Sequence, residues 1–326
     1  MYHGSGRVIK SNGGLFTLRL DPAKDAGPMP LDGRTVTGRG RGSLHRKGAL
    51  LVGDRAAVSY DDTAFAAENG ETIPAADGTG LAIDRIEDRK NELIRPPMAN
   101  LDVLFITVAA AAPEPLLSSI DRLICVAESR NIEPVLVFTK MELNPEKAET
   151  LRQLYSHAGF SVFCTGENDA AGTDELRTYL QTALCGKIAA FSGASGVGKS
   201  TLLNRLFPSL ALQTGTLSQR IERGKNTTRT VELYPITDTT DCGYIADTPG
   251  FGILDFERFD FFGKETLPLT FREFRPYLGQ CRYTKCSHTK EQGCAILEAL
   301  RNGEIAPSRH QSFVELYDIL KKKTKW

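Results

Sequence analysis

Residues 191–200 read FSGASGVGKS, and the last eight match the phosphate-binding pattern G-x-x-x-x-G-K-[ST]. An apolar run leads into this loop and the helical stretch KSTLLNRLF continues from it. The glycines let backbone N–H groups turn toward phosphate oxygens, the lysine adds positive charge at the β and γ phosphates, and the serine hydroxyl can ligate Mg²⁺. The predicted nucleotide-binding residues here are Gly193, Ala194, Ser195, Gly196, Val197, Gly198, Lys199, Ser200 and Thr201.

A second phosphate-side motif follows about fifty residues later. ADTPG ends a predicted strand at Asp247 and continues to Gly250, an Asp-x-x-Gly pattern that brings a carboxylate near Mg²⁺ and a glycine N–H near the γ-phosphate. Between the two motifs, RGKNTTRT (223–230) is where a threonine would cap the metal and the γ-phosphate; Thr228 is the first choice and Thr227 the alternative. The predicted Mg²⁺ ligands are Ser200, Thr228 and Asp247.

The base-reading motif lies upstream of the phosphate loop. VLVFTKMEL (135–143) is a buried-strand pattern ending in Thr139, Lys140, Met141 and Glu142, the layout of the Asn-Lys-x-Asp motif that reads guanine. In that motif the acid accepts hydrogen bonds from guanine N1 and N2, which adenine cannot offer. FSVFCTGEN (160–168) ends a further strand at Cys164 and Thr165, where a loop N–H could reach guanine O6.

This order predicts a circularly permuted GTPase domain, with the base-reading half before the phosphate-holding half. Moving the termini leaves each strand's place in a sheet unchanged, so permutation is physically inexpensive. From about residue 100, near-continuous apolar strands alternate with helices expected at 116–129, 145–157 and 173–184, which indicates an α/β fold with a parallel sheet. The first eighty residues predict short strands of a small β-barrel, with a loop at 68–80.

A possible metal site lies near the C-terminus. CRYTKCSHTKEQGC supplies Cys281, Cys286, His288 and Cys294, the ligand set of a closed structural zinc site. Four protein ligands leave no position for a catalytic water. The alternative is three reduced cysteines and an unrelated histidine. The other four cysteines are scattered as expected of reduced thiols, not of a disulfide framework.

Composition describes an ordinary soluble chain with basic ends. Of its 326 residues 41% are hydrophobic and 25% are charged. Residues 1–50 hold nine Lys and Arg against three Asp, a balance of +6, and residues 281–326 hold nine against five Asp and Glu, a balance of +4. Basic ends favour a polyanionic partner, although solvated charge is the alternative. We expect no membrane span, no signal peptide and a cytoplasmic location.

In this order, the motifs resemble the RsgA (YjeQ) family of circularly permuted small-ribosomal-subunit biogenesis GTPases. The resemblance extends to RGRGSLHRKGALLVGDRAAV (39–58) and DRKNELIRPPMANLDVLFI (88–106). It implies an OB-type barrel over 1–85, the permuted GTPase domain over 95–262 and a helical zinc-binding domain over 263–326.

The resemblance also implies a function. The family hydrolyses GTP to GDP and phosphate when stimulated by the small ribosomal subunit, and acts late in assembly while bound to ribosomal RNA. It implies one Zn²⁺ per chain, Mg²⁺ with GTP, and a monomer. The residues expected near the RNA-binding surface of the barrel are Arg39, Arg41, Arg46 and Lys47.

Three motifs carry departures at four positions: the Asn-Lys-x-Asp motif, the switch loop, and the residue after Asp-x-x-Gly. Thr139 and Glu142 replace Asn and Asp, which predicts reduced selectivity for GTP. Asn226 replaces the histidine implicated in hydrolysis, and Phe251, as in the family, replaces a water-orienting glutamine.

Catalysis is therefore predicted to be slow in isolation. The candidate catalytic residues are Asn226, Thr228 and Lys199, with Arg229 or the ribosome as other sources of the missing group. Two alternative functions stay open: a nucleotide-dependent RNA-docking switch with little hydrolysis, and a generic P-loop ATPase.

Overall fold

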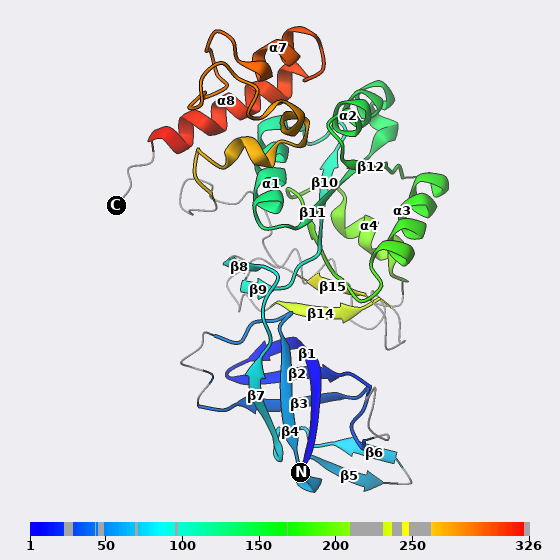
Figure 1. Cartoon of the computed structure of the whole chain (residues 1–326). Coiled ribbons are helices and arrows are strands. Elements are labelled where there is room, and N and C mark those ends of the chain that lie inside the picture. Colours follow the sequence, from blue (N-terminus) through cyan, green and yellow to red (C-terminus); the bar gives the residue numbers. More distant parts are fainter. Residues whose placement is uncertain are drawn as a thin grey trace. The chain divides into compact units, whose positions relative to one another are not determined.

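The computed structural model describes ten segments of the chain: residues 1–22, 29–42, 44, 49–68, 71–94, 97–167, 169–208, 231–236, 243–247 and 262–322 (Figure 1). The chain divides into two compact units. One is built from residues 1–102, 179–191 and 203–251, and the other from residues 103–178, 192–202 and 252–326. The domain boundaries expected from the sequence stay a prediction. Among the described helices, none has the length and apolarity needed to cross a membrane.

The first unit contains a closed five-stranded barrel, as the sequence predicts (Figure 1). Its strands are β1 (Tyr2–Asn12), β2 (Leu15–Leu20), β3 (Thr35–Gly40), β4 (Arg55–Tyr60) and β7 (Leu81–Ile86). They pair in the order β1-β2-β3-β7-β4, and β4 pairs back with β1 from Tyr2↔Tyr60 to Arg7↔Arg55. Alternate residues point inward and form the barrel core, for which Val8, Leu18 and Ile83 are fully buried.

The prediction of a loop at residues 68–80 is wrong in part. After η2 (Asp62–Ala64), strand β5 (Phe65–Glu68) pairs antiparallel with β6 (Glu71–Pro74). The sequence between these strands is Asn69-Gly70, the pair most favoured in two-residue hairpin turns. Other turn-forming residues follow within 68–80, so the sequence pattern predicts a loop for the whole stretch and the hairpin is not recognised.

The segment that joins the barrel to β10 is fixed by side chains of the sequence DRKN. It contains two short paired strands, β8 (Glu92–Ile94) and β9 (Pro97–Ala99). The Arg89 guanidinium donates to both carboxylate oxygens of the fully buried Asp54, at 2.7 and 2.8 Å. The Asn91 amide exchanges two hydrogen bonds with the backbone of Leu101, at 2.8 and 3.0 Å. These hydrogen bonds hold the junction in place through Asp54 and Leu101, in addition to the short pairing of β8 with β9.

The first unit also holds three strands from later in the chain. They are β13 (Ile188–Ser192), β14 (Glu232–Pro235) and β15 (Tyr244–Asp247). β13 and β15 are parallel, whereas β14 is antiparallel to β15. β14 also pairs with β1 through Lys10↔Glu232, and the Lys10 ammonium lies 3.0 Å from the Glu232 carboxylate.

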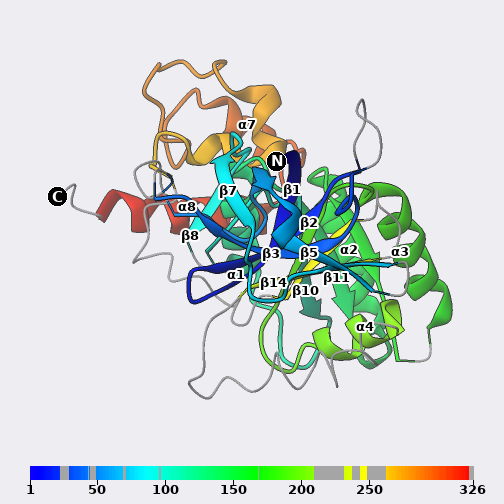
Figure 2. The ribbon, with the colours of Figure 1, turned by 90° about the horizontal axis from the view of Figure 1, so that it is seen from below.

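The second unit contains three parallel strands covered by helices, as expected of an α/β fold. The strands β10 (Val103–Ala109), β11 (Glu133–Thr139) and β12 (Ser161–Cys164) pair in the order β12-β11-β10. Every residue of β10 is buried. The helices α1 (Leu117–Ser129) and α2 (Pro145–His157) belong to this unit, whereas α3 (Ala170–Ala183) and α4 (Lys199–Leu206) begin in it and end in residues of the first unit. α1 lies on one side of β10 and β11, and α2 lies on the other (Figures 1 and 2).

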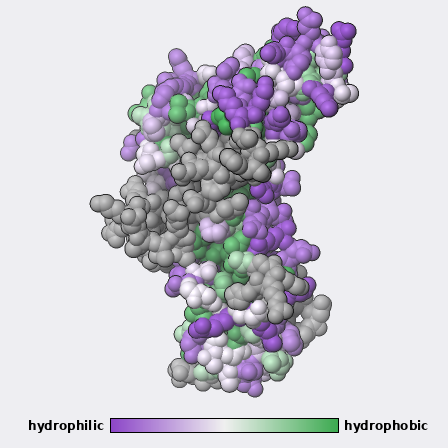
Figure 3. Space-filling view, turned by 90° about the vertical axis from the view of Figure 1, so that its left-hand side faces the viewer, coloured by the Kyte–Doolittle hydropathy of each residue, from purple (hydrophilic) through white to green (hydrophobic). Residues whose placement is uncertain are grey.

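The C-terminal residues form short helices around their own aromatic core. The elements are η4 (Leu267–Thr270), η5 (Arg272–Tyr277), α7 (Ala295–Arg301) and α8 (Pro307–Lys322). Phe271, Phe274 and Phe313 are fully buried, and Cys125 and Val126 of α1 belong to the same cluster. The surface near the top of Figure 3, at the height of α7 in Figure 1, is mainly hydrophilic.

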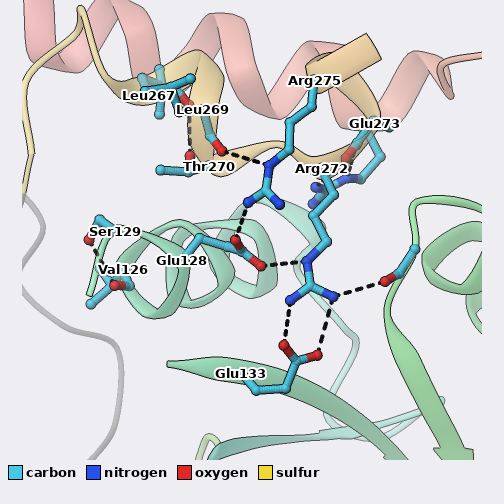
Figure 4. A network of polar contacts seen from close by, with 12 residues as sticks. Val126, Glu128, Ser129, Glu133, Leu267, Leu269, Thr270, Arg272, Glu273 and Arg275 are labelled. Atoms are coloured by element: carbon cyan, nitrogen blue, oxygen red, sulfur yellow. Dashed lines mark hydrogen bonds and ion pairs between the residues drawn. The ribbon is translucent and has the colours of Figure 1, made fainter. Parts of the chain in front are cut away.

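Two arginines bind this C-terminal region to α1 and β11. Arg272 lies 2.6 Å from the carboxylate of Glu128 and 2.7 Å from that of Glu133 (Figure 4). Deeper in the unit, Arg309 pairs with the buried Asp121 and with Glu273, the latter at 2.6 Å. Burial raises the pKa of Asp121, and the Arg309 charge opposes that rise. These pairs join residues that are far apart in the sequence.

Candidate nucleotide and metal sites

The phosphate loop has the backbone that its glycines permit. Gly196 and Gly198 have φ of 79° and 91°, values that other residues rarely adopt. A Cβ at Gly193 would lie 2.5 Å from the carbonyl oxygen of Thr107 in β10, so a side chain does not fit there. No atom would lie within 4 Å of a Cβ at Gly196, and Ala194, Ser195 and Gly196 are exposed. The loop therefore presents its backbone to any ligand outside.

The helix after the loop begins with the two residues expected to act on phosphate. Lys199 is the first residue of α4 and is half-buried, and its ammonium donates to the carbonyl of Gly193 at 3.4 Å. Ser200 is half-buried and Thr201 is exposed. A helix N-terminus carries partial positive charge, so this end of α4 favours an anion.

Thr139 ends β11 and contacts the phosphate loop directly. Its side chain is 5% exposed, and its hydroxyl donates to the carbonyl of Val197. The carbonyl of Val108 lies 3.3 Å from the same hydroxyl. A single donor thus bridges β10, β11 and the phosphate loop at the carboxyl end of the parallel strands.

Lys140 makes the second contact between the two motifs. Its backbone is left-handed, with φ of 56°, and its exposed ammonium donates to the carbonyls of Gly196 and Ala112, each at 2.6 Å. A Cβ at Gly198 would lie 3.9 Å from Cε of Lys140. The predicted base-reading and phosphate-holding motifs, distant in sequence, therefore lie against each other.

Glu142 is exposed and its carboxylate is held over the loop that follows β12. Oε2 accepts a hydrogen bond from the backbone N–H of Glu167 at 3.1 Å. A Cβ added at Gly166 would approach Glu142 Oε2 to 2.9 Å and Met141 Cγ to 3.1 Å. The longer acid thus folds back onto Gly166, where only glycine leaves room.

The end of β12 supports this loop. The backbone N–H of Thr165 donates to the carbonyl of Phe138 at 2.7 Å, and the Thr165 carbonyl accepts from the N–H of Met141 at 3.3 Å. Burial raises the pKa of the neighbouring Cys164 thiol to about 11. Cys164 is therefore a neutral packing residue at ordinary pH, and not a nucleophile.

Several predicted site residues lie outside what the structure describes. They include Asn226, Thr228 and Gly250. The alternatives Thr227 and Arg229, and Phe251 after the Asp-x-x-Gly motif, also lie outside the described residues. Asp247 is the last residue of β15, but its side chain also lies outside the described part.

The four predicted metal ligands come together in the C-terminal region. The ligand atoms of Cys281, Cys286, His288 and Cys294 all lie within 4.8 Å of one another. Nδ1 of His288 is 3.5 Å from Sγ of both Cys281 and Cys294, and these two sulfurs are 3.8 Å apart. Tetrahedral zinc with its usual bond lengths requires separations of about 3.5 Å for N···S and about 3.8 Å for S···S. The measured distances therefore fit a tetrahedral metal site.

Two side chains that the sequence did not mark contact the loop of the predicted metal ligands. The carboxylate of Glu291 accepts hydrogen bonds from the loop around His288, and the His310 imidazole contacts the His288 carbonyl. The sequence does hint at the role of Glu291, which lies in the short loop between His288 and Cys294, because a carboxylate in a tight loop can accept hydrogen bonds from backbone N–H groups. His310 lies in α8, and no local pattern marks its contact.

Known proteins resemble this chain over most of its length. A profile of the RsgA GTPase family matches residues 86–257. The "Small ribosomal subunit biogenesis GTPase RsgA" of Alkaliphilus metalliredigens is 37% identical and covers 98% of this chain and 99% of its own. The protein of the same name from Ruminiclostridium cellulolyticum is 41% identical, with 97% and 93% covered.

Two solved structures share the fold. YjeQ from Thermotoga maritima has a TM-score of 0.76 and 28% sequence identity, with 99% of this chain and 100% of that chain covered. YloQ, described as a circularly permuted GTPase, has a TM-score of 0.71 and 29% identity over 100% and 98%. Motif order, strand arrangement and full-length similarity agree, and the chain belongs to the RsgA family of circularly permuted GTPases.

Proposed function

We propose that this chain hydrolyses GTP to GDP and phosphate, stimulated by the small ribosomal subunit, as a late assembly factor. The observation that carries the proposal is the contact between Lys140 and the carbonyl of Gly196, at 2.6 Å. It joins a base-reading motif to a phosphate loop, as one nucleotide spanning both would require.

The phosphates would lie on the loop and the base on the upstream motif. The residues proposed for the phosphate side are Gly193, Ala194, Ser195, Gly196, Val197, Gly198, Lys199, Ser200 and Thr201, with Gly250. Lys140 would lie along the purine, and the carboxylate of Glu142 would accept from guanine N1 and N2. Glu142 already faces the Gly166–Glu167 turn, which supports this role.

Mg²⁺ would be held by Ser200, Thr228 and Asp247. Ser200 lies at the start of α4, where a phosphate-bound cation is expected. The ion, when bound, neutralises charge that develops on the β–γ bridge.

The chain's own residues would do the remaining work. Lys199 would balance charge on the β- and γ-phosphates as the bond between them breaks and GDP leaves, Thr228 would close over the γ-phosphate, and Asn226 would orient the attacking water. Without a histidine at 226, turnover of the isolated chain is expected to be slow.

The C-terminal cluster would hold one structural Zn²⁺ through Cys281, Cys286, His288 and Cys294. Four protein ligands fill a tetrahedral site, so the metal would stabilise the C-terminal region and take no part in hydrolysis. The measured ligand separations support this.

Ribosomal RNA is the proposed partner of the basic ends of the chain. Arg39 and Arg41 are exposed on the barrel, while Arg46 and Lys47 lie outside the described residues. Phosphate contacts of this kind weaken as salt rises. We further propose a cytoplasmic monomer with domains at 1–85, 95–262 and 263–326.

GTP turnover measured with and without purified small subunits tests the proposal. We expect strong stimulation by the subunits, competition by GDP and weaker competition by ATP. Lys199→Ala and Ser200→Ala should abolish stimulated turnover. Equal competition by ATP would favour a general ATPase, and nucleotide binding without stimulated turnover would favour an RNA-docking switch.

A further inference from the structure

The metal-ligand histidine lies in a strained turn that two other side chains hold. His288 has a left-handed backbone, with φ of 58°, which is unfavourable for a residue with a side chain. This conformation lets Nδ1 face Cys281 and Cys294 at 3.5 Å. Something other than local preference must therefore keep the turn in place.

Glu291 binds the backbone on both sides of His288. One carboxylate oxygen accepts the N–H of Ser287 at 2.9 Å and also its hydroxyl. The other oxygen accepts the N–H groups of Thr289 and Lys290, at 3.2 and 3.1 Å. The backbone N–H groups of Ser287, Thr289 and Lys290 thus share one carboxylate.

His310 holds the remaining side of the turn. Its Nε2 is 2.8 Å from the carbonyl of His288, and because a carbonyl only accepts, this nitrogen must carry the proton. His310 is buried within α8 and packs near Phe274 and Phe313. The turn is thereby tied to the aromatic core of the C-terminal region.

We infer that Glu291 is a positioning residue for the metal site, which holds the turn 287–290 so that His288 presents Nδ1 to the metal, with His310 as its second support. This inference rests on the zinc site proposed above. Outer-shell partners of metal ligands are worth about 10–100-fold in metal affinity. The Glu291 carboxylate accepts from backbone N–H groups and from one hydroxyl of the turn, so it would act by fixing ligand geometry.

Zinc affinity of the full-length protein tests the inference. The dissociation constant would be measured by competition with a chromophoric chelator for wild type, Glu291→Ala and the control Glu298→Ala. Glu298 is an exposed acid in α7, one turn after Cys294, so its loss removes the same charge nearby. We expect Glu291→Ala to weaken zinc binding about 10–100-fold and Glu298→Ala to change it less than threefold.

A spectrum separates positioning from general stability. With Co²⁺ in place of Zn²⁺, loss of the imidazole ligand should shift the d–d bands of Glu291→Ala while sulfur-to-metal charge transfer persists. Glu291→Asp, one methylene shorter, should give an intermediate affinity and serves if the alanine variant does not fold.

The two proposals can fail separately. Wild-type affinity and an unchanged spectrum in the Glu291 variants would overturn the inference, even if the metal-free protein became less stable. A wild-type chain that binds no zinc would overturn the zinc site as well.

Discussion

Thr139→Val should weaken nucleotide binding by loosening the phosphate loop. Valine keeps the shape of threonine but removes the hydroxyl that donates to Val197 and lies 3.3 Å from the Val108 carbonyl. One hydroxyl gives one proton, so the loss is one buried hydrogen bond, about 1–2 kcal/mol when a carbonyl is left unsatisfied. If this hydrogen bond orders the phosphate loop before the nucleotide binds, the nucleotide affinity of Thr139→Val falls by about 5–30-fold.

The assay is titration with a fluorescent GDP or GTP analogue, at fixed Mg²⁺. Thr150→Val is the matched control, because the Thr150 hydroxyl also donates to a backbone carbonyl, that of Glu146 at 2.9 Å, but on the exposed side of α2. GDP and GTP should lose affinity equally, since the bond lies on the backbone of the loop. A Thr139→Val dissociation constant within twofold of wild type and of the control would refute the reasoning.

Three further outcomes follow from packing and burial. Gly166→Ala should raise the GTP dissociation constant about tenfold in the same titration, because its Cβ would lie 2.9 Å from Glu142 Oε2 and displace that carboxylate; an unchanged value would argue against Glu142 as the base reader. Arg309→Ala should lower the free energy of unfolding in urea by about 3–5 kcal/mol, because it leaves buried carboxylates unpaired, and a loss below about 1 kcal/mol would contradict this. Cys164, whose pKa burial raises to about 11, should react with iodoacetamide at pH 8 more slowly than the exposed Cys185, because a half-buried thiol with a raised pKa is mostly protonated and less accessible; mass spectrometry showing equal labelling would disprove it.

The sequence predicts the elements that carry strong periodicity. The helix expected at 145–157 coincides with α2, which begins after Asn144, whose side chain accepts from the N–H of Lys147. The apolar run VLFITVA (103–109) is strand β10, buried on both faces. Both depend on local patterns that a single sequence carries.

Contacts that depend on tertiary structure were not predictable. Nothing near Thr139 indicates that its hydroxyl reaches Val197, and nothing near His310 indicates the carbonyl of His288. The hairpin of β5 and β6 was missed because turn-forming residues on both sides outweighed its Asn-Gly pair. Polar contacts between distant segments follow from the fold and not from spacing.

The shared aromatic core of the C-terminal region has a consequence for synthesis on the ribosome. Cys125 and Val126 pack into a cluster whose other members, such as Phe271 and Phe313, are translated much later. At typical elongation rates the nascent α1 waits on the order of ten seconds or more for these partners. During that interval the side of α1 that carries these two residues lacks its native partners from the C-terminal region.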